Sequence, residues 1–212
     1  MSVVVPTITA ENSHQYREQI ERVESFANHL HVDIMDGIFT PNTGTDLASL
    51  WLPKNITCDI HVMYDHPETI VDDPKLPDLS VRTVILQAES HANFKHIAHV
   101  LKKLHIQLGI SVLAESPLSV YADLIRMADH ILIFSGNLGH QGGSFANLDL
   151  LRKVAQAKEM NPHAEIGWDG GVNEHNIKQI SDAGVTIINV GGYIHHSDKP
   201  KEKYRLLQQQ IA

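Results

Sequence analysis

The sequence predicts an α/β fold in which eight parallel strands alternate with helices and close into a (β/α)8 TIM barrel, with residues 1–212 forming one domain. Eight short runs are rich in β-branched residues, as strands are, and segments with helical spacing separate most of them. The 212 residues allow about 26 residues for each strand and its helix, near the short end of the range for such barrels. An open, doubly wound sheet is the alternative, because its parallel strands need the same helical crossovers.

The expected strands are runs of four to seven residues in which Val, Ile, Leu and Thr predominate. Such side chains pack well on a pleated, buried surface. The runs are Val3 to Ile8, Leu30 to Met35, Thr57 to Met63, Val81 to Leu86, Gln107 to Val112, His130 to Phe134, Glu165 to Trp168 and Val185 to Val190. Strand followed by helix is therefore the repeating unit to the end of the chain.

The expected helices place apolar residues at helical spacing between the strands. They are Ser13 to Phe26, Asn93 to Leu104, Pro117 to Met127, Asn147 to Glu159, Asn173 to Ala183 and Lys199 to Gln210. Three of them begin with residues that favour helix starts, namely Ser13, Ser116 before Pro117, and Asn173 followed by Glu174. The weakest helical candidates are Asp46 to Leu52 and the stretch after His66.

The composition excludes several classes of partner. Seventeen Lys and Arg residues against 25 Asp and Glu residues give a net charge of −8, and no basic run could neutralise a row of phosphates, so we expect no nucleic-acid partner. No apolar run approaches the roughly 20 residues that span a bilayer, so we expect no membrane partner. The only cysteine, Cys58, cannot form a disulfide within the chain, and the first residues do not resemble a signal peptide. These features predict a cytoplasmic protein.

The most informative stretch for chemistry is His31-Val32-Asp33-Ile34-Met35-Asp36-Gly37. Side chains alternate between the two faces of a strand, so His31, Asp33 and Met35 share one face. If this face points into a barrel, an imidazole and a carboxylate lie at the carboxyl end of a strand, where barrel active sites are built. The structural alternative is a hydrogen-bonded His–Asp pair in the core.

Two further strands favour the functional interpretation. His61 and Met63 share a face at the end of the next strand, and Asp169 ends the seventh strand immediately before Gly170. Two imidazoles and two carboxylates at one barrel mouth form a mixed nitrogen and oxygen donor set. Such a set suits one divalent ion such as Zn²⁺, Fe²⁺, Mn²⁺ or Co²⁺.

Glycines follow each of the last three strands, as Gly139-His140-Gln141-Gly142-Gly143, Gly170-Gly171 and Gly191-Gly192. Glycine lets backbone N–H groups approach an anion closely, and barrels frequently hold a phosphate at the late strand ends. The sequence thus predicts a phosphate site that needs no lysine. The neighbouring pair His195-His196 is expected in an exposed loop, with a place at the barrel mouth as the alternative.

These residues together resemble the ribulose-phosphate 3-epimerase family over essentially the whole chain. The resemblance is carried by Pro6-Thr7-Ile8, by His31 to Gly37, by Asp59-Ile60-His61-Val62-Met63 and by Trp168-Asp169-Gly170-Gly171-Val172. It implies a (β/α)8 barrel in which His31, Asp33, His61 and Asp169 bind the metal, and Asp33 and Asp169 are the catalytic acid and base. It further implies that Gly170, Gly171, Gly191 and Gly192 hold phosphate, that Gly142 and Gly143 close over it, and that Thr7, Met35 and Met63 contact the substrate.

The sequence departs from the family pattern outside the expected ligands. The loop after the sixth strand reads Asn137 to Gly143 with displaced glycines, and Phe134 replaces a usual methionine. Thr7 replaces a serine, and Gln87-Ala88-Glu89 replaces a His-Val-Glu pattern. Leu113-Ala114 replaces Asn-Pro. These changes concern the choice of sugar more than the reaction.

The resemblance implies epimerisation at C3 of a ketose phosphate, with ribulose 5-phosphate and xylulose 5-phosphate as the expected pair and a homo-oligomer as the expected assembly. A six-carbon ketose phosphate such as allulose 6-phosphate is the nearest alternative. A paralogue that binds a sugar phosphate without turnover is another. A carboxy-lyase or aldehyde-adding barrel of the same superfamily would need a catalytic lysine, and none lies on these strands.

Overall fold

The computed structural model describes residues 1–140 and 142–212, and in it eight parallel strands form a closed barrel in which each strand pairs with its neighbours in sequence and β8 pairs with β1. The strands are β1 Val3–Thr9, β2 His29–Met35, β3 Thr57–Met63, β4 Val81–Gln87, β5 Gln107–Val112, β6 His130–Phe134, β7 Glu165–Asp169 and β8 Ile187–Val190. The predicted (β/α)8 barrel is confirmed, and the open-sheet alternative is wrong. Gln141, in the glycine-bearing loop after β6, lies outside the described residues.

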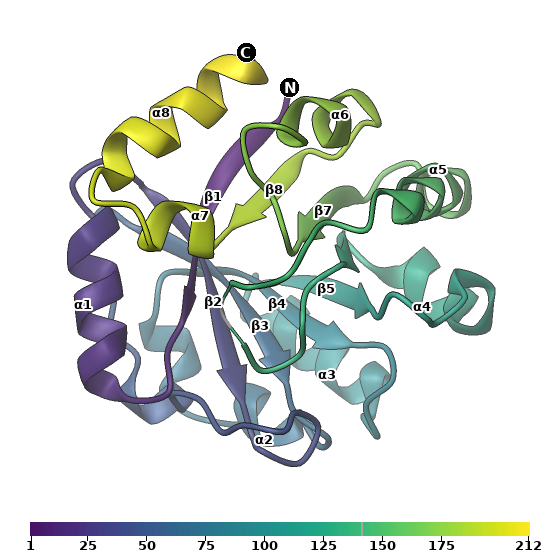
Figure 1. Ribbon diagram of the computed structural model, residues 1–212. Coiled ribbons are helices and arrows are strands. Elements are labelled where there is room, and N and C mark those ends of the chain that lie inside the picture. The colour runs from purple at the N-terminus through teal and green to yellow at the C-terminus, as the bar shows by residue number, and fades with distance from the viewer. Residues whose placement is uncertain (141) are drawn as a thin grey trace.

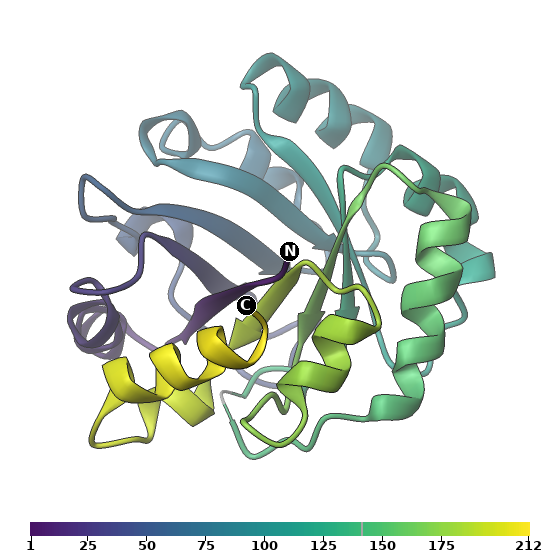
Figure 2. The ribbon, with the colours of Figure 1, turned by 90° about the horizontal axis from the view of Figure 1, so that it is seen from above.

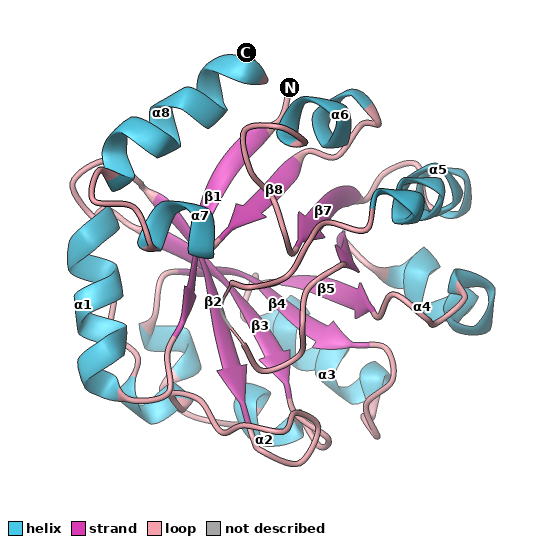
Figure 3. Ribbon diagram, in the orientation of Figure 1, coloured by secondary structure: helices cyan, strands magenta, loops and turns pink. Residues whose placement is uncertain are grey.

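Helices form a ring around the strands, as Figures 1 and 3 show. They are α1 Ser13–Val23, α2 Glu68–Val71, α3 Phe94–Lys103, α4 Ala122–Met127, α5 Leu151–Met160, α6 Ile177–Asp182, α7 Gly192–His195 and α8 Pro200–Gln210. The two chain ends lie close together beside α8 in both orientations of the ribbon (Figures 1 and 2). Among the described residues, no helix combines the length and the apolar character needed to cross a membrane.

Helix boundaries differ from the expected ones where polar side chains form turns. Asn12, rather than Ser13, caps α1, because its side-chain oxygen accepts hydrogen bonds from two backbone N–H groups of the first turn. Asn173 accepts from the backbone N–H of His175 and so forms a turn, and α6 begins only at Ile177. The segment before α4 is a 3₁₀ turn over Leu118–Tyr121, and the helix α7 was not expected.

Strand residues divide between two environments according to their parity. The outward side chains, such as Val32, Ile34 and Val62, join one large apolar cluster with the inner faces of the helices. Fully burying each such side chain stabilises the fold by about 1.5–3 kcal/mol. The inward side chains of β2 and β3 are instead polar up to the methionine that ends each strand, and they include His31 and His61, which are completely buried. The register pairs Asp33 with His61 across β2 and β3, so this alternation brings polar groups of neighbouring strands together inside the barrel.

The amino-terminal end of the barrel interior holds a charged group of side chains that we call the Arg82 network. It consists of His29, Asp59, Arg82 and Glu165. Arg82 binds both carboxylate oxygens of Asp59, through Nε at 2.9 Å and Nη2 at 2.7 Å, and its Nη1 lies 2.5 Å from Glu165. Burial alone would raise the pKa of Asp59, but hydrogen bonds from His29 and Arg82 outweigh burial and hold this pKa well below its usual range.

Candidate active site

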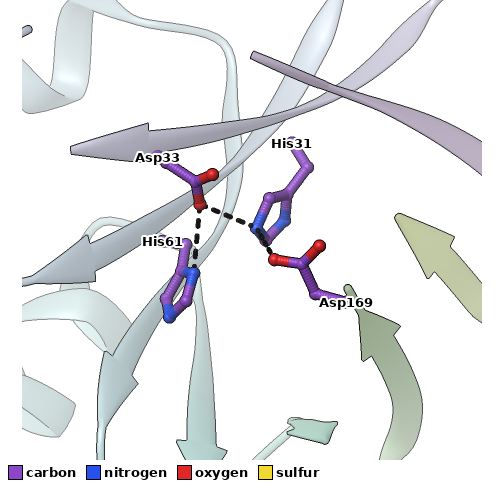
Figure 4. A group of neighbouring side chains, drawn as sticks. All are labelled: His31, Asp33, His61 and Asp169. Carbon is purple, nitrogen blue, oxygen red and sulfur yellow. Dashed lines mark hydrogen bonds and ion pairs between the residues drawn. The ribbon is translucent and has the colours of Figure 1, made fainter. Parts of the chain in front are cut away.

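Four ionisable side chains meet at the carboxyl-terminal end of the barrel interior, and we call them the His–Asp cluster. They are His31 and Asp33 of β2, His61 of β3 and Asp169 of β7. Figure 4 shows all four pointing toward one another. One ligand atom from each lies within 4.8 Å of the others, and all four residues are buried. Strand alternation in a closed barrel produces this convergence, because each residue occupies an inward position on its strand.

Asp33 is the centre of the His–Asp cluster. Its Oδ1 lies 3.1 Å from His61 Nδ1 and 3.3 Å from His31 Nε2. Its other oxygen, Oδ2, accepts a hydrogen bond of 2.6 Å from Thr9 Oγ1. Asp169 Oδ2 lies 3.8 Å from His31 Nε2. The two rings thus present one nitrogen each to the space between the carboxylates.

The His–Asp cluster has the properties of a divalent-metal site. His31 Nε2 is buried and has no hydrogen-bond partner among residues 1–140 and 142–212, although leaving a buried polar atom unpaired costs about 1–3 kcal/mol. The cluster contains two nitrogen and two carboxylate donors, which is a set that first-row divalent ions accept. A cation between these four groups would satisfy the unpaired nitrogen and balance the two carboxylates, so the residues present fit a metal.

The two carboxyl groups of the cluster have opposite pKa shifts. Burial would raise the pKa of Asp33, but the imidazole of His31 and the hydrogen bond from His61 outweigh it and lower this pKa well below its usual range. Burial and then the negative charge of Asp33 raise the pKa of Asp169 to about 7. Without a metal, one group is therefore ionised and the other titrates near neutral pH, which is the division of roles that paired acid and base catalysts need.

A cavity of about 300 Å³ opens above the cluster at the barrel mouth. Asp33, Asp169, Thr9 and Asn189 lie on its walls, and the rest is formed mainly by the loops after β6, β7 and β8. The lining residues include Thr7, Met63, Phe134, His140, Gly142, Gly143, Gly170, Gly171, Gly191, Gly192 and His196. No Lys or Arg belongs to the lining within the part of the chain that the structure describes.

The glycines of these loops allow their backbones to pack closely. A Cβ atom on Gly171 would lie 2.0 Å from the backbone nitrogen of Ala146, and Gly171 has a φ of +70°. Gly192 lies so close to the loop after β6 that a Cβ would come within 2.9 Å of the Cα of Gly142. These contacts join the loops after β6, β7 and β8 into one wall, and the wall presents backbone groups to the cavity.

The structure brings together most of the residues that the sequence predicted for the site. All four members of the His–Asp cluster converge, and Thr7, Met63 and the six predicted glycines line the cavity. Met35 is buried but is not part of the lining; its side chain packs against Gly44 in the segment after β2. The expectation of an exposed loop is wrong for His195, which is buried in α7, whereas His196 lines the mouth.

Three polar residues near the cluster were not singled out by the sequence interpretation. Thr9 bonds Asp33, Asn189 lies against His31, and Gln87 lies against His61. Each occupies an inward strand position. A polar residue on the same face of its strand as the expected ligands would therefore have indicated these three positions from the sequence. Gln87 was noticed only as a departure from the family pattern.

Comparison with known proteins identifies one family along almost the whole chain. A family model described as the ribulose-phosphate 3 epimerase family matches residues 3–195. The ribulose-phosphate 3-epimerase of Mycobacterium tuberculosis is 30% identical over 218 residues, covering 99% of this chain and 93% of the relative. The enzyme of the same name from Aquifex aeolicus is 28% identical, covering 92% of this chain and 90% of the relative. A chloroplastic ribulose-5-phosphate-3-epimerase of Arabidopsis thaliana is 29% identical, covering 91% of this chain and 71% of that protein.

Solved structures share the barrel at much lower sequence identity. A 3-hexulose-6-phosphate synthase from Salmonella typhimurium superposes with a TM-score of 0.71 at 14% identity, covering 99% of this chain and 98% of the other. An orotidine 5'-phosphate decarboxylase from Pyrococcus horikoshii gives 0.69 at 13% identity, covering 99% of both chains. At such identities the likeness concerns the fold alone.

Proposed function

This chain belongs to the ribulose-phosphate 3-epimerase family, a family of isomerases that act on carbohydrates, and from that premise we propose that it inverts C3 of a ketose phosphate with the help of one divalent metal ion. The His–Asp cluster carries this proposal, because it supplies a metal site and two carboxylates of different pKa in one buried place. Zn²⁺, Fe²⁺, Mn²⁺ and Co²⁺ all suit its donor set.

The ligands we propose are His31 through Nε2, His61 through Nδ1, and one oxygen each of Asp33 and Asp169. A divalent ion held there would stabilise the negative charge that develops on the substrate oxygens when the proton leaves C3. Thr9 donates to the Asp33 oxygen that faces away from the two rings, and so it fixes the plane of that carboxylate.

Asp33 and Asp169 perform the two proton transfers in this proposal. One ionised carboxylate removes the proton from C3, next to the C2 carbonyl, and the other carboxyl group delivers a proton to the opposite face of the same carbon. In the site without a metal the pKa of Asp33 is lowered and that of Asp169 is raised, and we assign Asp33 as the base and Asp169 as the acid for one epimer. The roles exchange for the other epimer, because the reverse reaction passes through the same enediolate with the two proton transfers in the opposite order.

Water exclusion protects the enediolate that exists between the two transfers. Met63 and Phe134 line the cavity beside the carboxylates and present apolar surface to the reacting carbons. Met35 lies behind this wall rather than on it, so we assign it a packing role in holding the loop after β2.

We propose that backbone N–H groups of the late strand ends hold the substrate's phosphate. These groups belong to Gly170, Gly171, Gly191 and Gly192, and Gly142 and Gly143 lie on the opposite wall. Support comes from the close packing of these loops and from the absence of Lys and Arg in the described lining. Backbone donors at a nest of glycines can bind an anion without a cationic side chain.

The expected substrates are ribulose 5-phosphate and xylulose 5-phosphate. A six-carbon ketose phosphate such as allulose 6-phosphate is the second candidate, because the loop after β6 departs from the family pattern and places His140 on the cavity wall. We further propose a cytoplasmic homo-oligomer. The single cysteine, Cys58, is buried and unpaired, in keeping with a reducing compartment, and light scattering of the purified protein measures the assembly.

One experiment tests the reaction and the substrate together. The metal-loaded protein is incubated in D₂O with a panel of pentulose and hexulose phosphates and their free sugars, and deuterium at C3 is followed by NMR. We expect exchange and epimerisation with one phosphorylated ketose, and loss of both after chelation. Binding without exchange for every member of the panel would instead identify a paralogue without turnover.

A further inference from the structure

Both histidines of the His–Asp cluster are backed by a buried amide side chain. Gln87 Nε2 lies 2.9 Å from Nε2 of His61, and Asn189 Nδ2 lies 3.1 Å from Nδ1 of His31. The amides come from β4 and β8 and touch the ring nitrogens that face away from the carboxylates. All four side chains belong to residues with at most 1% exposure, so both contacts are buried.

The orientation of these amides leaves two acceptors unused. Gln87 Oε1 and Asn189 Oδ1 are buried and have no hydrogen-bond partner within the described residues. An amide nitrogen can only donate, so the ring nitrogen that it meets has to accept. The ring proton of His61 therefore lies on Nδ1, where it faces Asp33, and that of His31 lies on Nε2, between Asp33 and Asp169. This arrangement stabilises the carboxylates with N–H groups.

Metal binding requires the other tautomer of both rings. A ligating nitrogen must offer its lone pair, so the proton has to lie on the nitrogen that faces the amide. That N–H group then needs an acceptor, and the unused amide oxygen becomes one when the terminal torsion of Gln87 or Asn189 turns by about 180°, since such torsions are roughly two-fold. For Gln87 the rotated NH₂ group also finds a candidate acceptor in Ser111, its register partner on β5, whose buried Oγ has no partner among the residues described.

We propose that Gln87 and Asn189 are positioning residues whose amide groups reverse when the metal enters and thereby hold His61 and His31 in the ligating tautomer. The inference rests on the proposed metal site and not on the identity of the sugar. Removing either amide should therefore lower the affinity for the metal, although all four ligands remain.

Metal affinity tests this proposal. Gln87→Met and Asn189→Leu keep the approximate side-chain size and remove the acceptor, and Gln107→Met is the matched control. Gln107 is an amide on β5 whose Oε1 accepts a hydrogen bond from Thr83, away from the cluster. In Zn²⁺ titrations against a chelator, we expect the two site variants to lose about 10- to 100-fold in affinity and the control to keep the wild-type value. Equal affinity in all four proteins would overturn the proposal.

Two further measurements separate positioning from packing. Long-range ¹H–¹⁵N spectra of the wild type should show His61 protonated on Nδ1 without metal and on Nε2 with Zn²⁺; the same tautomer in both states contradicts the switch. Gln87→Glu, which retains an acceptor of the same shape, should bind Zn²⁺ at least as tightly as the wild type, and a loss equal to that of Gln87→Met would show that the acceptor is irrelevant. These readouts need no turnover, so a wild type that binds Zn²⁺ but fails the D₂O experiment refutes the epimerase proposal alone.

Discussion

The two ends of the barrel interior use the same residue types in opposite ways. The Arg82 network at the amino-terminal end and the His–Asp cluster at the carboxyl-terminal end each combine histidine with a buried carboxylate. In the network, the guanidinium of Arg82 binds both oxygens of Asp59 and reaches Glu165. In the cluster, two carboxylates face each other without a cationic side chain among the described residues that form it, and one imidazole nitrogen has no partner.

The difference shows what distinguishes a structural charge group from a site. Buried carboxylates are costly unless a partner compensates them. The network contains its own cation, so it is complete and the pKa of Asp59 is low. The cluster lacks one, so burial and then the charge of Asp33 raise the pKa of Asp169. An ion or a proton from outside is needed to balance the two carboxylates. Buried carboxylates without a cationic partner, more than the presence of His and Asp, therefore indicate which end of the barrel holds the active site.

The largest expected effect is on catalysis at the carboxyl-terminal end. Asp33→Asn and Asp169→Asn should each lower kcat by at least about 10²- to 10⁴-fold, since an amide cannot transfer the proton, and metal affinity should fall as well. The melting temperature of metal-free Asp169→Asn should stay the same or rise, because burial and the charge of Asp33 raise the pKa of this carboxyl. That of Asp33→Asn should fall, because the folded protein stabilises the ionised form of Asp33. Steady-state kinetics with calorimetry check this, and either variant keeping more than a tenth of the activity contradicts the assigned roles.

The opposite pattern is expected at the amino-terminal end. Arg82→Met leaves Asp59 buried without its cation, and breaking such a pair typically costs about 3–5 kcal/mol, somewhat less here because the Arg82 side chain is 27% exposed. Urea unfolding should show this loss, while kcat and Zn²⁺ affinity of the folded protein stay at wild-type values. A variant that is stable but inactive would mean that the two ends are not independent.

Sequence pattern predicted the carboxyl-terminal end better than the amino-terminal end, and the register explains why. His31, Asp33 and His61 lie on strands of regular alternation, so parity alone placed them inside the barrel. Arg82 lies at an irregularity where β3 pairs Cys58 with Val81 but Asp59 with Thr83. Arg82 is the extra residue of β4 at this irregularity, and its side chain reaches Asp59 inside the barrel. Simple alternation with Thr83 would have placed it on the outer face. Such a bulge has no signature in the order of apolar and polar residues.

Loop geometry was also beyond the sequence pattern. Glycines after β6, β7 and β8 were correctly expected at the cavity, because strand ends meet at the mouth of a barrel. The position of Met35 was not expected. Its side chain packs against the backbone segment around Gly44 and does not line the cavity. The side-chain partners Gln87 and Asn189 became visible only through contacts between strands distant in sequence.

Acid should destabilise the protein through the Arg82 network. The pKa of Asp59 is depressed in the folded state. The nearby imidazole of His130 and the hydrogen bond from Arg82 lower the pKa of Glu165 to about 2. Groups with depressed folded pKa values contribute stability fully above their unfolded pKa, near 4, and lose it as the pH falls toward the folded value. The free energy of unfolding in urea should therefore drop between about pH 5 and pH 2. Arg82→Met should flatten this drop; an unchanged slope would assign the acid sensitivity to other carboxylates.

The smallest expected effect distinguishes substrate binding in the cavity from metal binding in the His–Asp cluster, both at the carboxyl-terminal end of the barrel. Gly192→Ala would place a Cβ 2.9 Å from the Cα of Gly142, so the loops after β6 and β8 must move apart by a few tenths of an ångström. No ligand of the cluster lies in either loop, and Zn²⁺ affinity should be unchanged. The Michaelis constant for the phosphorylated ketose should rise several-fold with little change in kcat, because a displaced wall weakens backbone contacts to the phosphate that are made equally in ground and transition states. The free sugar, which lacks the charge-assisted hydrogen bonds, should bind poorly to wild type and variant alike. If Gly192→Ala lowered kcat and left the Michaelis constant alone, the phosphate would have to lie elsewhere in the cavity.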